Sequence, residues 1–317
     1  GKKIQMNEGV CPAYSDCRMG LSPDKFILSY CNRALGITSA EEQPVLPKGN
    51  NLSLHLLELF TSQVAKVGMT DGIRQVLQEE SDALRAYYEQ AGILIARPAG
   101  GTSCRLAISA KGGTNAENHN HNDVGSYAVA LGSETMVGDQ GGPNSYPGDY
   151  FNGDAPQKYK IKGSFGHPVP VVDGRTQSSG GKAKGVVLQK EFTNEKDVFS
   201  IDYTSAYSTP NLDKLIRTFV YDRQGKGSFT VGDEFTAKTP IRFETAITTR
   251  ADWKILDDTH LLLATDSEQM IVAIEASGKV AFTSETIEVN SPAYTRIGIA
   301  LKNQSKEGYI RLKMYTK

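Results

Sequence analysis

The sequence lacks the features of two large classes of protein. It has no block of basic residues, and its 35 lysines and arginines are balanced by 36 acidic residues to a net charge of −1. Because nucleic-acid binding proteins gather positive charge into a patch, we expect no nucleic-acid partner. No apolar run approaches the roughly 20 residues that a membrane-spanning helix needs, so we also expect no membrane span.

Cysteine is scarce, and its positions exclude one kind of metal site. No two of the four cysteines form the CxxC pattern that is typical of structural zinc. Cys11 and Cys17 could close a small loop in an oxidising compartment, but ordinary buried thiols are an equally good interpretation. Because the chain begins at Gly1 with no methionine before it, we expect it to be a fragment of a longer protein.

The spacing of apolar residues divides the chain into two parts. Up to about residue 90 they recur at helical spacing, and we predict helices at about 24–35, 52–68 and 81–90. From residue 91 the period changes to two. We therefore predict a helical segment at 1–90 and a domain at 91–317 that is a large antiparallel β-sandwich, which makes the fold mainly β.

Short runs of β-branched and aromatic residues mark the expected strands. Turns rich in Gly, Asn and Asp separate them, which favours a sandwich over alternating strands and helices. The runs lie at residues 93–96, 105–108, 126–130, 186–188, 199–203, 215–221, 270–274 and 309–314.

Three of the five histidines lie close together in the sequence. The run 118–123 reads Asn-His-Asn-His-Asn-Asp and holds His119 and His121. Residues two apart on an extended strand share one face, so we expect both imidazoles to face one cation or one substrate. Asp139 follows in a glycine-rich turn, and His167 comes later, before a proline.

Two histidines and one carboxylate are a suitable ligand set for zinc with an open fourth position. The ligands we predict are His121, Asp139 and His167, on separate strands that meet on one sheet face. Asp123 could accept the N–H of a ligating ring. The same set could instead bind a uronate carboxylate directly, without metal. The two remaining histidines, which we interpret as structural, are His55 and His260.

Tyrosines in the segment between Asp139 and His167 could either pack or exchange a proton with a substrate. They are Tyr146, Tyr150 and Tyr159. Other interpretations of these motifs fit less well. The turn at 138–142 has no lysine after its glycines and so is not a phosphate loop. A cupin needs a glutamate a few residues after its paired histidines, and none stands there.

Taken in order, these motifs resemble the heparinase II/III-like polysaccharide lyases. In that family they read Gly-Gly…His-Asn-His-Asn-Asp, then Asp-x-Gly, then His-x-x-Pro-x-x-Asn-Gly. The similar runs here are 111–127, 138–141 and 167–177, and residues 11–16 resemble a loop that precedes the last toroid helices. One departure is Asp173, where asparagine is usual. The similarity extends from about residue 10 to 220.

The resemblance implies an (α/α) toroid, of which this chain would hold only the end, followed by an antiparallel β-sandwich. It implies zinc as the cofactor, organising the site rather than activating water. The ligands it implies are His121, Asp139 and His167. It also implies that His119 faces the cleft near the scissile bond and that Tyr150 or Tyr159 lines it, which makes these three our candidate catalytic residues.

The implied reaction is β-elimination on a uronic-acid-containing polysaccharide, such as a glycosaminoglycan or an alginate-like chain. A base must remove the C5 proton, which neutralisation of the C6 carboxylate makes acidic, and an acid must protonate the leaving oxygen. The resemblance further implies a bacterial periplasmic or secreted location. The alternative is a non-catalytic carbohydrate-binding or structural module with a structural zinc, because the family's cleft also uses toroid residues.

Overall fold

A computed structural model describes residues 4–7, 9–21, 83–288 and 292–317. The chain forms two compact units, and the larger one joins Gln5–Leu21 to Leu84–Lys317. The smaller one, Gly1–Ile4 with Ser22–Ala83, lies outside the described residues apart from Ile4 and Ala83. The helices predicted at 24–35 and 52–68, the end of the toroid and His55 therefore also lie outside them.

The larger unit is built from antiparallel sheets, so the prediction of a mainly β fold is confirmed. A five-stranded sheet contains, in spatial order, β1 (Arg85–Tyr88), β2 (Ile93–Ala96), β3 (Leu106–Lys111), β5 (Tyr127–Leu131) and β6 (Glu134–Val137). An eight-stranded sheet contains β14 (Asp252–Asp257), β15 (His260–Ala264), β16 (Gln269–Ala276), β19 (Ser305–Thr316), β12 (Ser228–Ile241), β11 (Leu212–Asp222), β10 (Lys196–Asp202) and β9 (Val186–Phe192).

Two smaller sheets complete this unit. One contains β17 (Val280–Ile287), β18 (Tyr294–Leu301), β13 (Phe243–Thr249) and β7 (Val171–Val172), and the other pairs β4 (Thr114–Asn115) with β8 (Gly180–Lys184). Each of the predicted strand runs overlaps an observed strand. The helices are short: α4 (Ala155–Lys158) and the 3-10 turns η2 (Ser164–Gly166) and η3 (Thr204–Ala206). Among the described residues, none is long and apolar enough to span a membrane.

The prediction of a helix at about 81–90 is wrong. Residues Arg85–Tyr88 form strand β1, which pairs with β2. The apolar spacing that suggested a helix also suits a short strand. Tertiary packing decides between them: Tyr87 packs on the rings of Phe192 and Phe199, with both ring centroids 5.8 Å away. The sheet domain accordingly resumes at Leu84 rather than at residue 91, and it also takes in the segment Gln5–Leu21.

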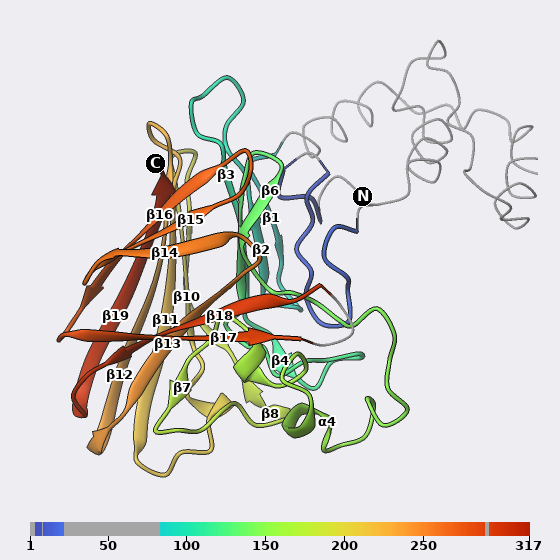
Figure 1. Cartoon of the computed structure of the whole chain (residues 1–317), viewed down its shortest axis with the longest axis vertical. Coiled ribbons are helices and arrows are strands. Elements are labelled where there is room, and N and C mark those ends of the chain that lie inside the picture. The colour runs from blue at the N-terminus through green and yellow to red at the C-terminus, as the bar shows by residue number, and fades with distance from the viewer. Residues whose placement is uncertain (1–3, 8, 22–82, 289–291) are drawn as a thin grey trace, which may run out of the picture. The chain divides into compact units, whose positions relative to one another are not determined.

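One hydrophobic core joins the inner faces of the three larger sheets, whose arrangement Figure 1 shows. The five-stranded sheet supplies Ile108 and Val129, the eight-stranded sheet supplies Phe219, and the four-stranded sheet supplies Phe243 and Ile297. In β11, buried and partly buried residues alternate, which is the period of a strand with one face on a core. The predicted sandwich is therefore present.

The outer face of the five-stranded sheet is covered by the segment Gln5–Leu21, as Figure 1 also shows. Small residues on that face, such as Ala107 and Ala128, leave room for Met6, which is buried against them. Further along the segment, the Tyr14 hydroxyl lies 2.8 Å from Ser109 Oγ on β3. This packing brings residues from the start of the chain beside the loops that carry the predicted site.

Candidate metal centre and its exposed histidine

The predicted ligands lie on three loops, so the expectation that they occupy strands on one sheet face is wrong. His121 lies in the connection from β4 to β5, Asp139 follows β6, and His167 directly follows η2. His119 has a positive φ of 56°, which turns the chain out of an extended path. As a result His119 and His121 do not share a face: the side chain of His119 is 64% exposed and that of His121 is fully buried.

The structure nevertheless brings the three predicted ligands together. His121, Asp139 and His167 each offer one ligand atom, and these atoms lie within 4.8 Å of one another. All three residues are buried, and the two imidazole centroids are 5.3 Å apart. Since two ligands about 2 Å from one zinc ion lie at most about 4 Å apart, small side-chain shifts would complete the set.

Burial and the neighbouring residues of the set shift the pKa of each of its three members. Burial alone would raise the pKa of Asp139, but His167, His121 and the Gly141 N–H lower that pKa to about 2. Burial would lower the pKa of His167, but the Asp139 carboxylate 2.9 Å from Nδ1 raises it. Burial dominates at His121 and lowers its pKa. The Asp139 carboxylate thus lies with one imidazole whose pKa is raised, His167, and one whose pKa is lowered, His121.

Unpartnered atoms show that the set fits a metal ion. Among the described residues, His121 Nδ1 and His167 Nε2 are buried and have no hydrogen-bond partner. Buried polar atoms are normally paired, so two bare ring nitrogens beside a carboxylate indicate a missing partner. Asp139 is itself oriented by the Ser126 hydroxyl, which donates to Oδ2 at 3.0 Å, and by Gly141 N–H, which donates to Oδ1 at 3.0 Å. Such support is typical of metal-ligating carboxylates.

Sequence reasoning missed Asp16, which links the exposed histidine to the buried one. Asp16 Oδ2 lies 2.8 Å from His119 Nδ1, and Oδ1 lies 3.1 Å from His121 Nε2. Burial would raise the pKa of Asp16, but the hydrogen bonds with the two imidazoles lower it. The only sequence signal was the resemblance of residues 11–16 to a family loop, which did not single out this side chain.

The candidate tyrosines differ in their surroundings. Tyr150 is fully buried, and its hydroxyl lies 3.1 Å from His121 Nε2. Burial, together with the nearby Asp16, raises the pKa of Tyr150. Tyr159 contacts this group only through its ring, 5.5 Å from that of Tyr150, while its hydroxyl donates to Asp149. The structure therefore places Tyr150 at the metal set and directs the Tyr159 hydroxyl elsewhere.

An exposed aromatic surface lies next to His119. Phe151, 54% exposed, packs edge-on against the His119 ring at 5.4 Å, and Tyr146, 42% exposed, lies 5.0 Å from Phe151. Lys162 Nζ lies 4.8 Å from the Phe151 ring and donates to the Tyr150 carbonyl at 2.7 Å. His119 therefore stands at an accessible surface that offers aromatic rings, with the buried Lys162 ammonium behind them.

Buried polar residues hold the site loops on the sandwich. Arg217, from β11, donates to the carbonyls of Gly125 and Pro168, at 2.7 Å each. These carbonyls follow shortly after His121 and directly after His167. Asp123 accepts from Lys111 Nζ at 2.6 Å, so it makes an ion pair rather than receiving the N–H of a ligating ring as predicted.

The departure at Asp173 is explained by its backbone. Asp173 has φ 51° and Gly174 has φ 74°, within a turn that the bridge between Val172 and Arg175 closes. Asn and Asp tolerate this left-handed conformation better than other residues with a side chain. Aspartate therefore meets the same backbone requirement as the asparagine usual in the family.

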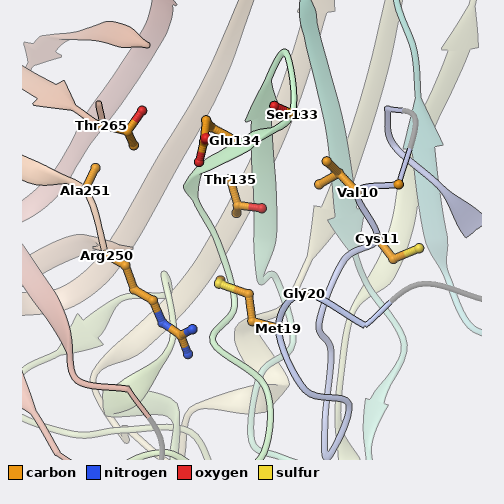
Figure 2. Close-up of a pocket in the computed structure, with 11 residues that line it drawn as sticks. Val10, Cys11, Met19, Gly20, Ser133, Glu134, Thr135, Arg250, Ala251 and Thr265 are labelled. Atoms are coloured by element: carbon orange, nitrogen blue, oxygen red, sulfur yellow. The ribbon is translucent and has the colours of Figure 1, made fainter. Parts of the chain in front are cut away.

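A separate cavity of about 320 Å³ lies along the N-terminal segment and contains none of the predicted site residues. Figure 2 shows Val10 and Cys11 on one side of it and Ala251 and Thr265 on the other, with the turn at Glu134 between them. Cys11 and Cys17 are both free thiols in the structure. His260, interpreted as structural, lies at the start of β15, where its Nδ1 is 2.9 Å from Asp257.

No family model and no curated protein matches the sequence. Solved structures do match. The superposition on a heparinase III structure covers 99% of this chain and 46% of the heparinase chain, at 15% sequence identity and with a TM-score of 0.64. A heparinase III with methylated lysines covers 100% of the chain at 12% identity with a TM-score of 0.67, over 44% of its own length.

Heparan sulfate lyase HepC from Pedobacter heparinus covers 99% of this chain at 14% identity, with a TM-score of 0.66 and 45% of its own length covered. The chain thus spans less than half the length of the structures it matches. The resemblance predicted from the motifs is confirmed at the level of the fold: the chain is folded like part of the heparinase III structures.

Proposed function

We propose that the chain forms the β-sandwich side of a polysaccharide lyase site that cleaves a uronic-acid-containing polysaccharide by β-elimination. The observation that carries the proposal is the exposed imidazole of His119, which Asp16 connects to the buried His121. The heparinase III-like fold supports it. From the same likeness we propose a bacterial periplasmic or secreted location, with this chain acting as part of a longer enzyme.

His119 is the proton-transfer group in this proposal. Its imidazole accepts the C5 proton of the uronate, the electron pair forms a C4=C5 double bond, and the C4–O glycosidic bond breaks. The imidazolium then returns a proton to the leaving oxygen, so that atoms and charges balance. Tyr150 is not given the role of the base in this proposal, because its hydroxyl is buried and burial raises its pKa.

Zinc, when bound by His121, Asp139 and His167, would hold the three site loops together. This is an organising role, and no bond-making step is assigned to it. Lys162, a buried residue, places its ammonium 4.8 Å from the Phe151 ring, beneath the exposed aromatic surface. Neutralising the uronate carboxylate is what makes the C5 proton acidic.

The test is to incubate the protein with heparan sulfate, other glycosaminoglycans and alginate and to follow the ultraviolet absorbance of the unsaturated product. The assay uses this chain and a longer form that carries a preceding helical domain. We expect His119→Ala to abolish turnover and keep zinc, and His121→Ala to lower zinc content. His260→Ala, which alters a histidine outside the site, should change neither. Full turnover by His119→Ala would contradict the proposal.

A carbohydrate-binding module without turnover is the second candidate. It is favoured by Phe151 and Tyr146, whose exposed rings form a surface on which a sugar could stack. Binding of a uronan that is lost in Phe151→Ala, with no absorbance change from either form of the protein, would select this function instead.

A further inference from the structure

Asp16 presents its two carboxylate oxygens to two different histidines. Oδ2 faces His119 Nδ1 at 2.8 Å, and Oδ1 faces His121 Nε2 at 3.1 Å. The Asp16 side chain is only 7% exposed, so water does not compete freely for these bonds. One carboxylate therefore lies between the imidazole that meets solvent and the imidazole that belongs to the buried set.

A neutral imidazole carries one N–H and one lone pair, and a carboxylate can only accept. The proton of His119 then lies on Nδ1, and that of His121 on Nε2, where the oxygen of the Tyr150 hydroxyl, 3.1 Å away, is a second acceptor. The lone pairs that remain are on His119 Nε2 and on His121 Nδ1. The second of these is the buried nitrogen that has no partner among the described residues.

We infer that Asp16 is a positioning residue that sets the tautomers of His119 and His121 together, which leaves one lone pair for substrate and one for metal. A carboxylate that accepts the outer N–H of a metal-ligating histidine fixes its ring and raises its basicity. Asp16 does this for His121 and does the same for His119, so one side chain prepares both nitrogens. The inference rests on the proposed function only for the role of His119 toward substrate.

The segment that carries Asp16 is held firmly enough for this task. Gly142 N–H donates to the Cys17 carbonyl at 3.0 Å, and Arg18 forms a β-bridge with Gly141. Gly141 has φ +68°, and a Cβ there would lie 1.7 Å from the Cys17 carbonyl oxygen. A glycine is therefore required where the Asp16 segment meets the Asp139 turn, and the two carboxylates are positioned by the same contact.

The test uses long-range ¹H–¹⁵N spectra of the histidine rings, recorded on the metal-free and the zinc-loaded chain at a pH where the imidazoles are neutral. Signals are assigned with His119→Ala and His121→Ala. We expect wild type to carry the His119 proton on Nδ1 and the His121 proton on Nε2, with or without zinc. A His119 proton on Nε2 in wild type, or zinc bound through His121 Nε2, would overturn the inference.

The matched variant is Asp16→Asn, whose amide can accept from only one of the two rings. We expect at least one of the two histidines to change tautomer, and Asp16→Ala to leave His119 a mixture of tautomers. Asp154→Asn, an exposed carboxylate that makes no capping bond at α4, should leave the spectra unchanged. Unchanged His119 and His121 spectra in a folded Asp16→Asn protein would refute the inference. If neither variant folds, the wild-type spectrum still decides.

Turnover provides a second, separate measurement. Where the longer form cleaves a uronan, Asp16→Asn should lower kcat at least about tenfold with little change in KM, since the substrate is still bound but the base is wrongly presented. An equal kcat would count against the inference. Absence of turnover in wild type would reject the proposed function but leave the tautomer result standing, so the two failures can be told apart.

Discussion

Two buried polar clusters lie close together in this protein, and they differ in how fully their atoms are paired. Arg217 donates five hydrogen bonds, to the Asp233 carboxylate, to Thr245 and to the carbonyls of Gly125 and Pro168. In the set of His121, Asp139 and His167, two ring nitrogens have no partner among the described residues. We call the fully paired set around Arg217 the closed cluster, which acts as a scaffold. The set with two unpaired ring nitrogens is the open cluster, which is the candidate metal site.

The largest effect is expected at the closed cluster. Arg217→Met leaves the Asp233 carboxylate buried without its ion pair, and removing one partner of a buried pair costs about 3–5 kcal/mol. We expect a loss of that size in the free energy of unfolding, measured with denaturant. Arg311→Ala, which removes the partly exposed pairs to Glu234 and Glu275, should cost less than about 1 kcal/mol. Equal losses would break the comparison.

The open cluster should respond to metal. Zinc at about 100 times its dissociation constant stabilises a protein by about 2.7 kcal/mol, so a chelator should lower the unfolding midpoint of wild type correspondingly. In His167→Ala this response should disappear, whatever the midpoint of the variant itself. His260→Ala serves as the control and should respond like wild type. A wild-type protein that binds no zinc and ignores the chelator would show that the open cluster is not a metal site.

A smaller effect is expected at the support of Asp139. Ser126→Ala removes the hydroxyl that donates to Oδ2, and loss of such an outer contact typically weakens metal binding about 10- to 100-fold. Zinc affinity is measured by competition with a chromophoric chelator. Ser200→Ala, which removes a hydroxyl bonded to Thr218 instead, should leave the affinity unchanged. Equal affinities of Ser126→Ala and wild type would show that Asp139 needs no such orientation.

The smallest effect concerns an exposed histidine–aspartate pair. The Thr259 backbone N–H and the hydrogen bond with His260 lower the pKa of Asp257 to about 2. A carboxyl group whose folded pKa lies below its unfolded value of about 3.9 stabilises the protein above that value and loses the effect as pH falls to the folded pKa. Asp257→Asn should therefore be slightly less stable than wild type at neutral pH, and the difference in unfolding midpoint should shrink as the pH falls to about 2 and be lost below it. A difference that persists there would contradict this assignment.

Much of the sandwich was predictable from sequence because alternation of buried residues is local. The run 215–221 reads correctly as a strand, since a strand with one face on the core must repeat every two residues. The same rule failed at 81–90, because the apolar residues there fit the spacing of a helix as well as that of a strand. Packing of Tyr87 on Phe192 and Phe199 decides for the strand. The rule failed again at His119, whose positive φ turns a run of alternating residues into a loop.

The chemical character of the site could also be predicted from sequence, because the residue types of a metal set are visible in the chain. The grouping of His121, Asp139 and His167 followed from motif order and is found in the fold. The exposure of His119 beside the buried His121 did not follow from the sequence, and neither did the roles of Asp16 and Arg217. These depend on which distant segments meet: the N-terminal segment lies over the small residues of one sheet face, and β11 reaches beneath the loops. Hydrogen bonds between such segments are a property of the tertiary structure, because nothing in the local sequence specifies the partner.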